Sequence, residues 1–420
     1  MDTKQLLLGI DIERDTMLLS YQVLSKTTYN EPVTVREKGN EQDGIALAAA
    51  WDKDRQEWVY GTAASEFSEN RADAIFERFF ADDTFHSDEM ICSYEEIVTG
   101  YIRYCLQLLH SLQPRPQNTL LVLTVDRVTK TVYDKLKAVF TEIGFRAEDV
   151  MIRSHQESFF YYMTAQDEKL WGHAVLLLDY RDEALLLYRM NIDRRTKPKL
   201  VRTELLGRLE LLSPLGESET VRKEADEKMV HFLIELTAGQ QHSSLFLVGS
   251  IFEERWFKGS LQYMAKLGRV FQGRNLFSRG AIYAGLKRLA RKDQAPEEFF
   301  IGEDMVTTNI GLDVTRRGKE TYFPLLTAGT NWYDGEAVHE FLLQDEESLR
   351  FSLQSLSGKN ERIHEMLLPG LVKREHKTVR IRVSLRCESK DVVDIRVTEL
   401  GFGEFFASTG KVWEEKIDLS

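Results

Sequence analysis

The sequence predicts an α/β body followed by an antiparallel β-domain. Residues 5–12 form an apolar run that ends in an aspartate and a charged turn, and residues 173–179 repeat this pattern. In each block a hairpin partner follows, and then an apolar strand with helical segments. This succession is typical of a mixed or parallel sheet that helices cover on both faces. Beyond residue 303, short strand-like runs between polar turns dominate.

Length and composition narrow the class of protein. The chain has 420 residues, 43% of them hydrophobic, and a formal net charge of −12 at pH 7. This length accommodates two or three domains of roughly 100–200 residues each. The acidic balance argues against nucleic acid and against anionic lipid as partners. Only three cysteines occur, none in a C-x-x-C pair, and no apolar run approaches the ~20 residues of a membrane span. We therefore expect a cytoplasmic protein in a reducing compartment, with no nucleic-acid or membrane partner.

In the first block, about residues 1–165, the periodicity of apolar residues predicts the strands and helices. Apolar or alternating segments predict strands, and apolar faces that recur every three to four residues predict helices. The expected strands are 5–12, 17–24, 45–50, 57–61 and 119–125, and the expected helices are 63–80, 94–112 and 128–143.

The second block, residues 166–294, repeats the arrangement, and a polar connector containing a proline follows at 291–298. We expect strands at 173–179, 183–190 and 244–248, and helices at 218–238, 253–266 and 276–292. The β-domain is expected over residues 303–420, with strands at 306–314, 338–344, 349–353, 378–387, 392–399 and 412–417.

The common catalytic and metal-binding motifs occur in this sequence only in incomplete form. Two His-Glu pairs begin like a zinc-protease helix, but Leu343 and Leu368 stand where the second histidine belongs. The glycines of 268–273 have phosphate-loop spacing without the lysine and hydroxyl that follow in such loops. No catalytic residue and no metal ligand is therefore assigned.

Five short segments in order resemble the nucleotide-binding motifs of the actin-like ATPase superfamily, most closely those of the seventy-kilodalton heat-shock chaperones. They are 8–12 and 175–184 (the two phosphate loops), 155–158 and 278–281 (the two connecting motifs), and 247–250 (the adenosine motif). The resemblance runs nearly end to end. It implies a two-lobed actin-like ATPase fold of duplicated ribonuclease-H-like units, followed by a β-sandwich similar to the chaperones' substrate domain. We expect the chaperones' helical lid to be missing.

The chemistry of those motifs is degenerate in this chain. The family's phosphate hairpins carry glycines and threonines because a Cβ would block close approach of phosphate to backbone amides. Phe76 stands at the position of the catalytic lysine and Gln156 at that of the glutamate in the first connecting motif. The substitutions in the two hairpins are Glu13, Arg14 and Asp15 in the first and Arg181, Asp182 and Glu183 in the second. The added carboxylates oppose the binding of a triphosphate.

The family-type residues that remain define a candidate cleft. Its positions are Asp11, Asp179, Gly249, Ser250 and Gly280. In the family, paired aspartates hold a hydrated Mg²⁺ beneath the phosphates. We expect no cofactor here, with Mg-ATP or Mg-ADP as the open alternative.

Two arginines of the altered hairpins are candidate fillers of the phosphate site. We hypothesise that Arg14 and Arg181 fold into that site and pair with Asp179 and Asp11, so that a guanidinium replaces the lost cation and phosphate. The alternative is that both arginines are solvated turn residues.

Three functions fit these observations. We expect a non-catalytic, heat-shock-chaperone-like scaffold or a module that binds a protein or peptide, without ATP hydrolysis. The first alternative is a divergent ATP-dependent peptide-binding chaperone with weak ATPase activity. The second alternative is an actin-like protein that forms assemblies. The sequence identifies neither the partner nor the oligomeric state.

Overall fold

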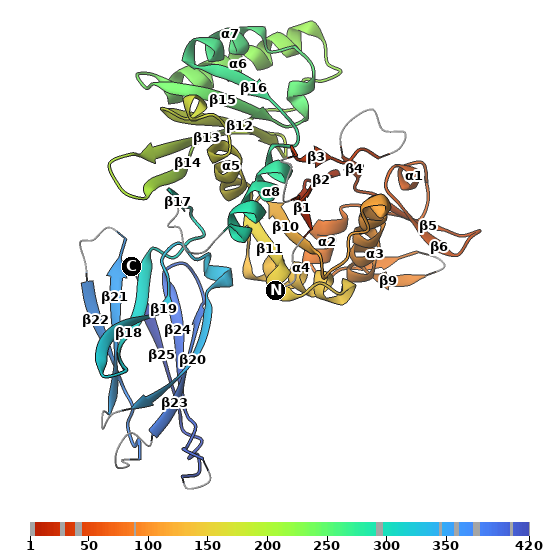
Figure 1. The fold of residues 1–420 in the computed structure, drawn as a ribbon. Coiled ribbons are helices and arrows are strands. Elements are labelled where there is room, and N and C mark those ends of the chain that lie inside the picture. The colour runs from red at the N-terminus through yellow and green to blue at the C-terminus, as the bar shows by residue number, and fades with distance from the viewer. Residues whose placement is uncertain are drawn as a thin grey trace. The chain divides into compact units, whose positions relative to one another are not determined.

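The computed structural model describes residues 5–25, 30–37, 44–87, 90–290, 297–343, 347–356, 361–372, 379–403 and 406–419. The chain divides into two compact units, Met1–Phe300 and Ile301–Ser420. The mixed α/β region and the antiparallel C-terminal region that the sequence predicts are both present (Figure 1). Residues 291–296 of the predicted connector lie outside the described residues, as do the predicted strand ends at Gln344 and Thr378.

The first sheet of the α/β unit is built around the hairpin of β1 and β2. Its strand order is β11-β10-β1-β2-β3, and β4 also pairs with β2. β1 runs parallel to β10 and β10 parallel to β11, whereas β2 is antiparallel to both β1 and β3. The strands are β1 (Leu6–Ile12), β2 (Thr16–Val23), β3 (Val33–Thr34), β4 (Ile45–Ala46), β10 (Thr119–Val125) and β11 (Val150–Ser154).

The second sheet has the order β16-β15-β12-β13-β14-β17. Here too a hairpin, β12 and β13, is flanked by an antiparallel third strand on one side and two parallel strands on the other. Asp11 and Asp179 each lie near the carboxyl end of the first strand of their hairpin. The strands are β12 (Ala174–Arg181), β13 (Ala184–Asp193), β14 (Lys199–Glu210), β15 (His242–Val248), β16 (Arg269–Gln272) and β17 (Glu298–Ile301).

Two helices connect the two sheets. α5 (His155–Thr164) and α8 (Leu276–Leu289) pack on each other, and α8 also packs on β1 and β10 (Figure 1). The contact is close because Gly280 has no side chain: a Cβ there would lie 2.1 Å from the carbonyl oxygen of Ser158. The sequence assigned α8 to the second lobe, but it covers the first sheet, and Ala281, Ile282 and Ala284 share a core with Leu7 and Val122.

The remaining helices cover the outer faces of the sheets. Met229 and Leu233 of α6 and Met264 of α7 are buried against the second sheet. The helices are α3 (Tyr94–Gln107), α4 (Lys130–Ile143), α6 (Glu219–Thr237) and α7 (Lys258–Leu267), and the short 3-10 turns are η1 (His110–Leu112), η2 (Ala147–Asp149), η3 (Glu168–Leu170) and η4 (Ser250–Glu253).

The predicted helix over 63–80 is wrong as a single element. It consists of α1 (Thr62–Ser65), β7 (Arg71–Ala72) and α2 (Ile75–Phe80). Ala74, just before α2, has a φ of 48°, a left-handed conformation that cannot continue a right-handed helix. The other small strands here are β5 (Ala49–Asp52), β6 (Glu57–Tyr60), β8 (Thr84–His86) and β9 (Ile91–Ser93).

The C-terminal unit consists of two antiparallel four-stranded sheets, ordered β19-β18-β21-β22 and β20-β23-β24-β25. Buried residues from both sheets, among them Phe351 and Val383, form one core. The strands are β18 (Thr308–Arg316), β19 (Lys319–Leu326), β20 (Glu336–Leu343), β21 (Ser348–Ser355), β22 (Glu361–Leu367), β23 (Val379–Cys387), β24 (Val392–Glu399) and β25 (Val412–Asp418), with η5 (Trp332–Asp334) before β20. Within the described residues of the whole chain, none of the helices is long and apolar enough to span a membrane.

Candidate functional site

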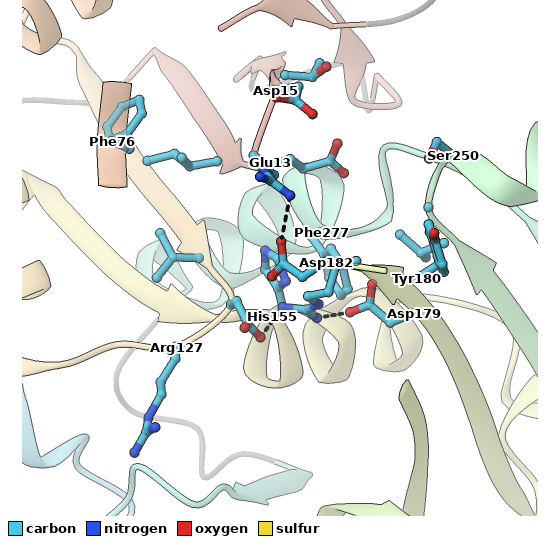
Figure 2. A pocket seen from close by; sticks show the side chains of 18 of the residues that line it. Glu13, Asp15, Phe76, Arg127, His155, Asp179, Tyr180, Asp182, Ser250 and Phe277 are labelled. Atoms are coloured by element: carbon cyan, nitrogen blue, oxygen red, sulfur yellow. Dashed lines mark hydrogen bonds and ion pairs between the residues drawn. The ribbon is translucent and has the colours of Figure 1, made fainter. Parts of the chain in front are cut away.

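A cavity of about 650 Å³ lies in the α/β unit where the β1–β2 and β12–β13 hairpins face each other. Its walls come from both hairpins, from α2, from the segment after β10 and from the end of β15. Figure 2 shows most of these side chains. The lining residues are Ile12, Glu13, Arg14, Asp15, Thr16, Phe76, Glu77, Phe80, Val125, Asp126, Arg127, Val132, His155, Asp179, Tyr180, Arg181, Asp182, Glu183, Val248, Gly249, Ser250, Arg274 and Phe277.

Arg181 holds the centre of the site. Its guanidinium contacts the carboxylates of Asp179 and Asp126 (Figure 2). The side chains of Arg181 and Asp179 are 17% and 5% exposed, whereas that of Asp126 is 57% exposed. Asp126 follows β10 in the first sheet and Arg181 ends β12 in the second, so this cation joins the two sheets.

Asp11 lies beneath the cavity and does not line it. It is fully buried, and its Oδ1 is 2.7 Å from Nε2 of His155, the first residue of α5. Burial raises the pKa of Asp11 to about 8, and the carboxylate of Asp126 raises it further while Arg181 opposes the shift. Burial also lowers the pKa of His155 well below its usual value, with Arg181 acting in the same direction. Near neutral pH the pair therefore carries no net charge.

The hairpin between β12 and β13 adopts a tight turn without glycine. Asp182 and Glu183 both have positive φ, 46° and 54°. Two left-handed residues in a two-residue loop are typical of a turn that favours Asn-Gly or Gly-Gly, and a glutamate there is strained. The turn thus has the backbone conformation of a glycine-rich two-residue loop, with two bulky side chains in it.

Arg14 does not pair with a buried aspartate, contrary to the hypothesis from the sequence. Its Nη1 lies 3.7 Å from Oδ1 of Asp182, and both side chains are 63% exposed (Figure 2). Neither arginine pairs with Asp11, which His155 occupies instead. The physical reason is geometry: Asp11 is shielded from the cavity, and the nearest accessible carboxylate on the opposite hairpin is Asp182.

The two glycines of the predicted cleft, Gly249 and Gly280, allow close packing of the backbone. Gly249 has a φ of 112°, and a Cβ there would lie 2.4 Å from the carbonyl oxygen of Tyr180, so its close approach is to the neighbouring strand end. Gly280 does not line the cavity and lies in the α5–α8 contact. Ser250 follows Gly249 at the start of η4 and lines the cavity.

One wall of the cavity is apolar. Phe76 and Phe80 of α2 line it, with their rings 6.0 Å apart, next to Val132 of α4. Gln156 does not line the cavity.

Glu13 is a further acidic group on the hairpin of the first sheet. Burial and the carboxylate of Asp11 raise its pKa to about 8, while Arg274 and Arg181 oppose that shift and Glu253 adds to it. Arg274 in turn lies 2.8 Å from Glu253. The environment of Glu13 therefore favours its protonated form.

The lining is acidic overall. It contains seven carboxylates and four arginines. Across the described residues, no group of three or more His, Cys, Asp or Glu side chains is arranged to hold a metal ion. The acidic groups are spread around the cavity, which suits a ligand longer than a single ion.

The sequence missed His155, Asp126 and Phe277. His155 and Asp11 are 144 positions apart, and the ring of His155 stacks on Phe277 with centroids 4.0 Å apart. The available signal for Asp126 was its place directly after a buried strand in the same sheet as Asp11, at the edge where parallel strands end.

Two family models match parts of the chain. A family model described as "Family of unknown function (DUF5716) C-terminal" matches residues 31–303, and one described as "Domain of unknown function (DUF8552)" matches residues 305–419. No curated protein matches. Among the solved structures, a non-polymerising MamK mutant bound to AMPPNP is 11% identical, and the match covers 69% of this chain and 99% of that chain with a TM-score of 0.39.

Proposed function

The chain belongs to the family of unknown function DUF5716, and from its cleft we propose that it is a non-hydrolysing binding protein of actin-like fold. In this proposal the α/β unit is a two-lobed body whose nucleotide site is closed by the chain's own side chains. The C-terminal β-unit, similar to a chaperone substrate domain in the resemblance above, is the module that binds a protein or peptide.

The strand orders support the actin-like fold. Each sheet has a hairpin at its centre, a third antiparallel strand beyond it, and two parallel strands on the other side. The two aspartates of the resemblance, Asp11 and Asp179, occupy matching positions near the carboxyl ends of β1 and β12. A duplicated unit is the simplest source of such a correspondence.

The observation that carries the proposal is the position of Arg181. In the resembled family, two aspartates share a hydrated Mg²⁺ beneath the phosphates. Here a guanidinium contacts Asp179, and the imidazole of His155 contacts Asp11. Both aspartates therefore have a partner that would have to be displaced before a metal–phosphate cluster could form, at the cost of exposing buried charge.

The same contacts support a scaffold that needs no nucleotide to stay closed. Arg181 of the second sheet contacts Asp126 of the first sheet. Arg14 of the first hairpin contacts Asp182 of the second hairpin. Each ion pair therefore joins the two halves of the α/β unit. The Arg14 pair is exposed and contributes at most about 1 kcal/mol. The Arg181–Asp126 pair also has a half-exposed carboxylate and contributes on the same scale, whereas the buried contact of Arg181 with Asp179 lies within β12 and holds the guanidinium in place.

Calorimetric titration with Mg-ATP and Mg-ADP, together with a phosphate-release assay, tests this function. We expect neither a heat of binding at millimolar nucleotide nor phosphate release. Micromolar binding with measurable phosphate release would overturn the proposal in favour of a divergent ATPase. Light scattering after size exclusion addresses assembly, and we expect a mass that does not grow with protein concentration.

A further inference from the structure

Two edge strands of the C-terminal unit carry the same seven-residue pattern. β20 and β22 each lie at the end of their sheet. Both read Glu-x-(Val or Ile)-His-Glu-x-Leu, over residues 336–342 and 361–367. Because side chains alternate along a strand, the two glutamates and the two apolar residues of each pattern share the exposed face. We propose that the free edge of β22 binds an extended peptide segment with basic residues at alternate positions.

The chemistry that satisfies this pattern is visible inside the unit, where β23 pairs antiparallel with β20. Arg386 lies opposite Glu336, with 3.5 Å between the charged groups. Arg382 lies opposite Glu340 at 2.9 Å, and Arg380 lies 3.6 Å from the same carboxylate. A strand with arginines at alternate positions therefore neutralises both glutamates.

The same two glutamates of β22 are not neutralised. The neighbouring strand β21 places Gln354 opposite Glu361 and Arg350 opposite Glu365. Glu361 accepts a hydrogen bond from Gln354, and Glu365 accepts one from Ser348. Across the residues that the structure describes, neither glutamate forms an ion pair. Two negative charges thus remain for a strand that is added on the free side of β22.

The free side of β22 is open to a further strand. Within the described part of the chain, β22 pairs with β21 alone, over seven consecutive residue pairs without a bulge (Figure 1). Such an edge presents unpaired backbone N–H and C=O groups. At the other end of this sheet, β19 contains Pro324 and its pairing with β18 shifts register, which disfavours addition there. β20 packs against β19 and is not equally open.

The apolar members of the pattern define the rest of the partner. Ile363 is 59% exposed and Leu367 is 68% exposed, and both lie on the face of Glu365. Covering them with apolar side chains is favourable by roughly 25 cal/mol per Å². The fitting segment therefore alternates along one face, with basic residues opposite Glu361 and Glu365 and apolar residues opposite Ile363 and Leu367. Backbone hydrogen bonds supply the affinity and these side chains the selectivity.

A second copy of this chain fits the edge less well. Two β22 strands related by a two-fold axis would pair antiparallel. With Ile363 or Glu365 on the axis, a glutamate faces a glutamate, which is destabilising. With His364 on the axis, each glutamate faces an apolar side chain and stays unneutralised. The charges therefore favour a basic segment over the same strand.

The inference rests on the proposed function, in which the β-unit binds a protein or peptide, and names the class of peptide. The probe is a fluorescent synthetic peptide with the sequence of residues 379–387 and Cys387→Ser. Anisotropy measures its binding to the full chain. We expect saturable binding that weakens as the salt concentration rises. A peptide with glutamine in place of its three arginines should not bind.

Charge reversal locates the site. E365K should weaken binding about tenfold, because a cross-strand attraction becomes a repulsion. E320K makes the same change on an exposed residue of β19, at the opposite edge of the same sheet, and should leave the affinity unchanged. The double variant E361K with E365K should instead bind a peptide that has glutamate in place of the arginines. Melting curves show whether each variant folds.

N-methylation of the peptide separates strand addition from charge attraction alone. Two peptides carry N-methyl groups on alternate residues, one at odd and the other at even positions. In an added antiparallel strand only one of these two sets of N–H groups faces β22. We therefore expect one methylated peptide to bind and the other not to bind.

Four outcomes would overturn the edge site: no binding of the arginine peptide, equal weakening by E320K and E365K, no gain of binding to the glutamate peptide by the folded double variant, or methylated peptides that behave alike. A mass that doubles with concentration in light scattering, and stays single in E365K, would assign the edge to a second copy instead. None of these outcomes involves nucleotide, so failure of the edge site is distinguishable from failure of the proposed function.

Discussion

Removing the guanidinium of Arg181 is the perturbation whose effect follows most directly from the structure. Arg181→Ala leaves the carboxylate of Asp179, with a side chain 5% exposed, without its cation. It also frees Asp126, but that side chain is 57% exposed and water can solvate it. The loss in the free energy of unfolding therefore comes almost entirely from the unpaired carboxylate of Asp179.

The magnitude follows from the burial of the pair. Removing one partner of a buried ion pair costs about 3–5 kcal/mol, and an exposed pair contributes about 0–1 kcal/mol. Because Arg181 itself is 17% exposed, we expect the lower end of the buried range, about 3 kcal/mol of the free energy of unfolding. Asp126→Asn, which removes only the exposed partner, should cost less than about 1 kcal/mol.

Urea unfolding is the suitable assay, since guanidinium chloride would screen the ion pair. Trp51, Trp58, Trp171 and Trp256 report on the α/β unit by fluorescence. The double variant Arg181→Met with Asp179→Asn removes both charges and should recover most of the loss, because no uncompensated charge remains. A loss below about 1 kcal/mol for Arg181→Ala, or a double variant as unstable as the sum of its parts, would refute the reasoning.

Three further predictions concern the same unit. Because the pKa of Glu13 is raised in the fold, the free energy of unfolding should fall as the pH rises from about 4.5 through about 8. Glu13→Gln should flatten that fall in melting curves recorded across this pH range. An unchanged slope would contradict the raised pKa of Glu13. Gly280→Ala would force a Cβ to within 2.1 Å of the carbonyl oxygen of Ser158 and should lower the free energy of unfolding by about 1–3 kcal/mol or more. Gly273→Ala, with no neighbour closer than 4.0 Å, should leave it nearly unchanged. Chemical denaturation measures both values. Glu183→Gly relieves a φ of 54° and should stabilise by about 0.5–1 kcal/mol, and a lower melting temperature would argue against strain in this turn.

Much of the fold could be predicted where periodicity and burial coincide. The strands at 119–125 and 392–399 have the predicted bounds because their apolar patterns are strong. β14, β19 and β22 were not predicted. Many of their side chains are exposed, so their pairing depends on neighbouring strands and leaves little pattern in the sequence.

The site was predictable only in part, for a related reason. Asp11 and Asp179 could be selected because each closes an apolar strand before a hairpin. The partner of Asp11, His155, comes from a helix 144 positions away, and its role depends on how α5 packs. Arg14 and Arg181 occupy similar turns in the sequence, yet only Arg181 turns inward, because Asp126 and Asp179 both lie within its reach.

In the proposed function, Arg181 occupies the place of the phosphates between the two hairpins. A crystal structure of the chain grown or soaked with Mg-ADP tests it most directly. We expect the guanidinium of Arg181 between Asp179 and Asp126, with His155 on Asp11 and no phosphate between the two hairpins. Density for Mg-ADP phosphates in that place, with Arg181 turned out toward solvent, would contradict it.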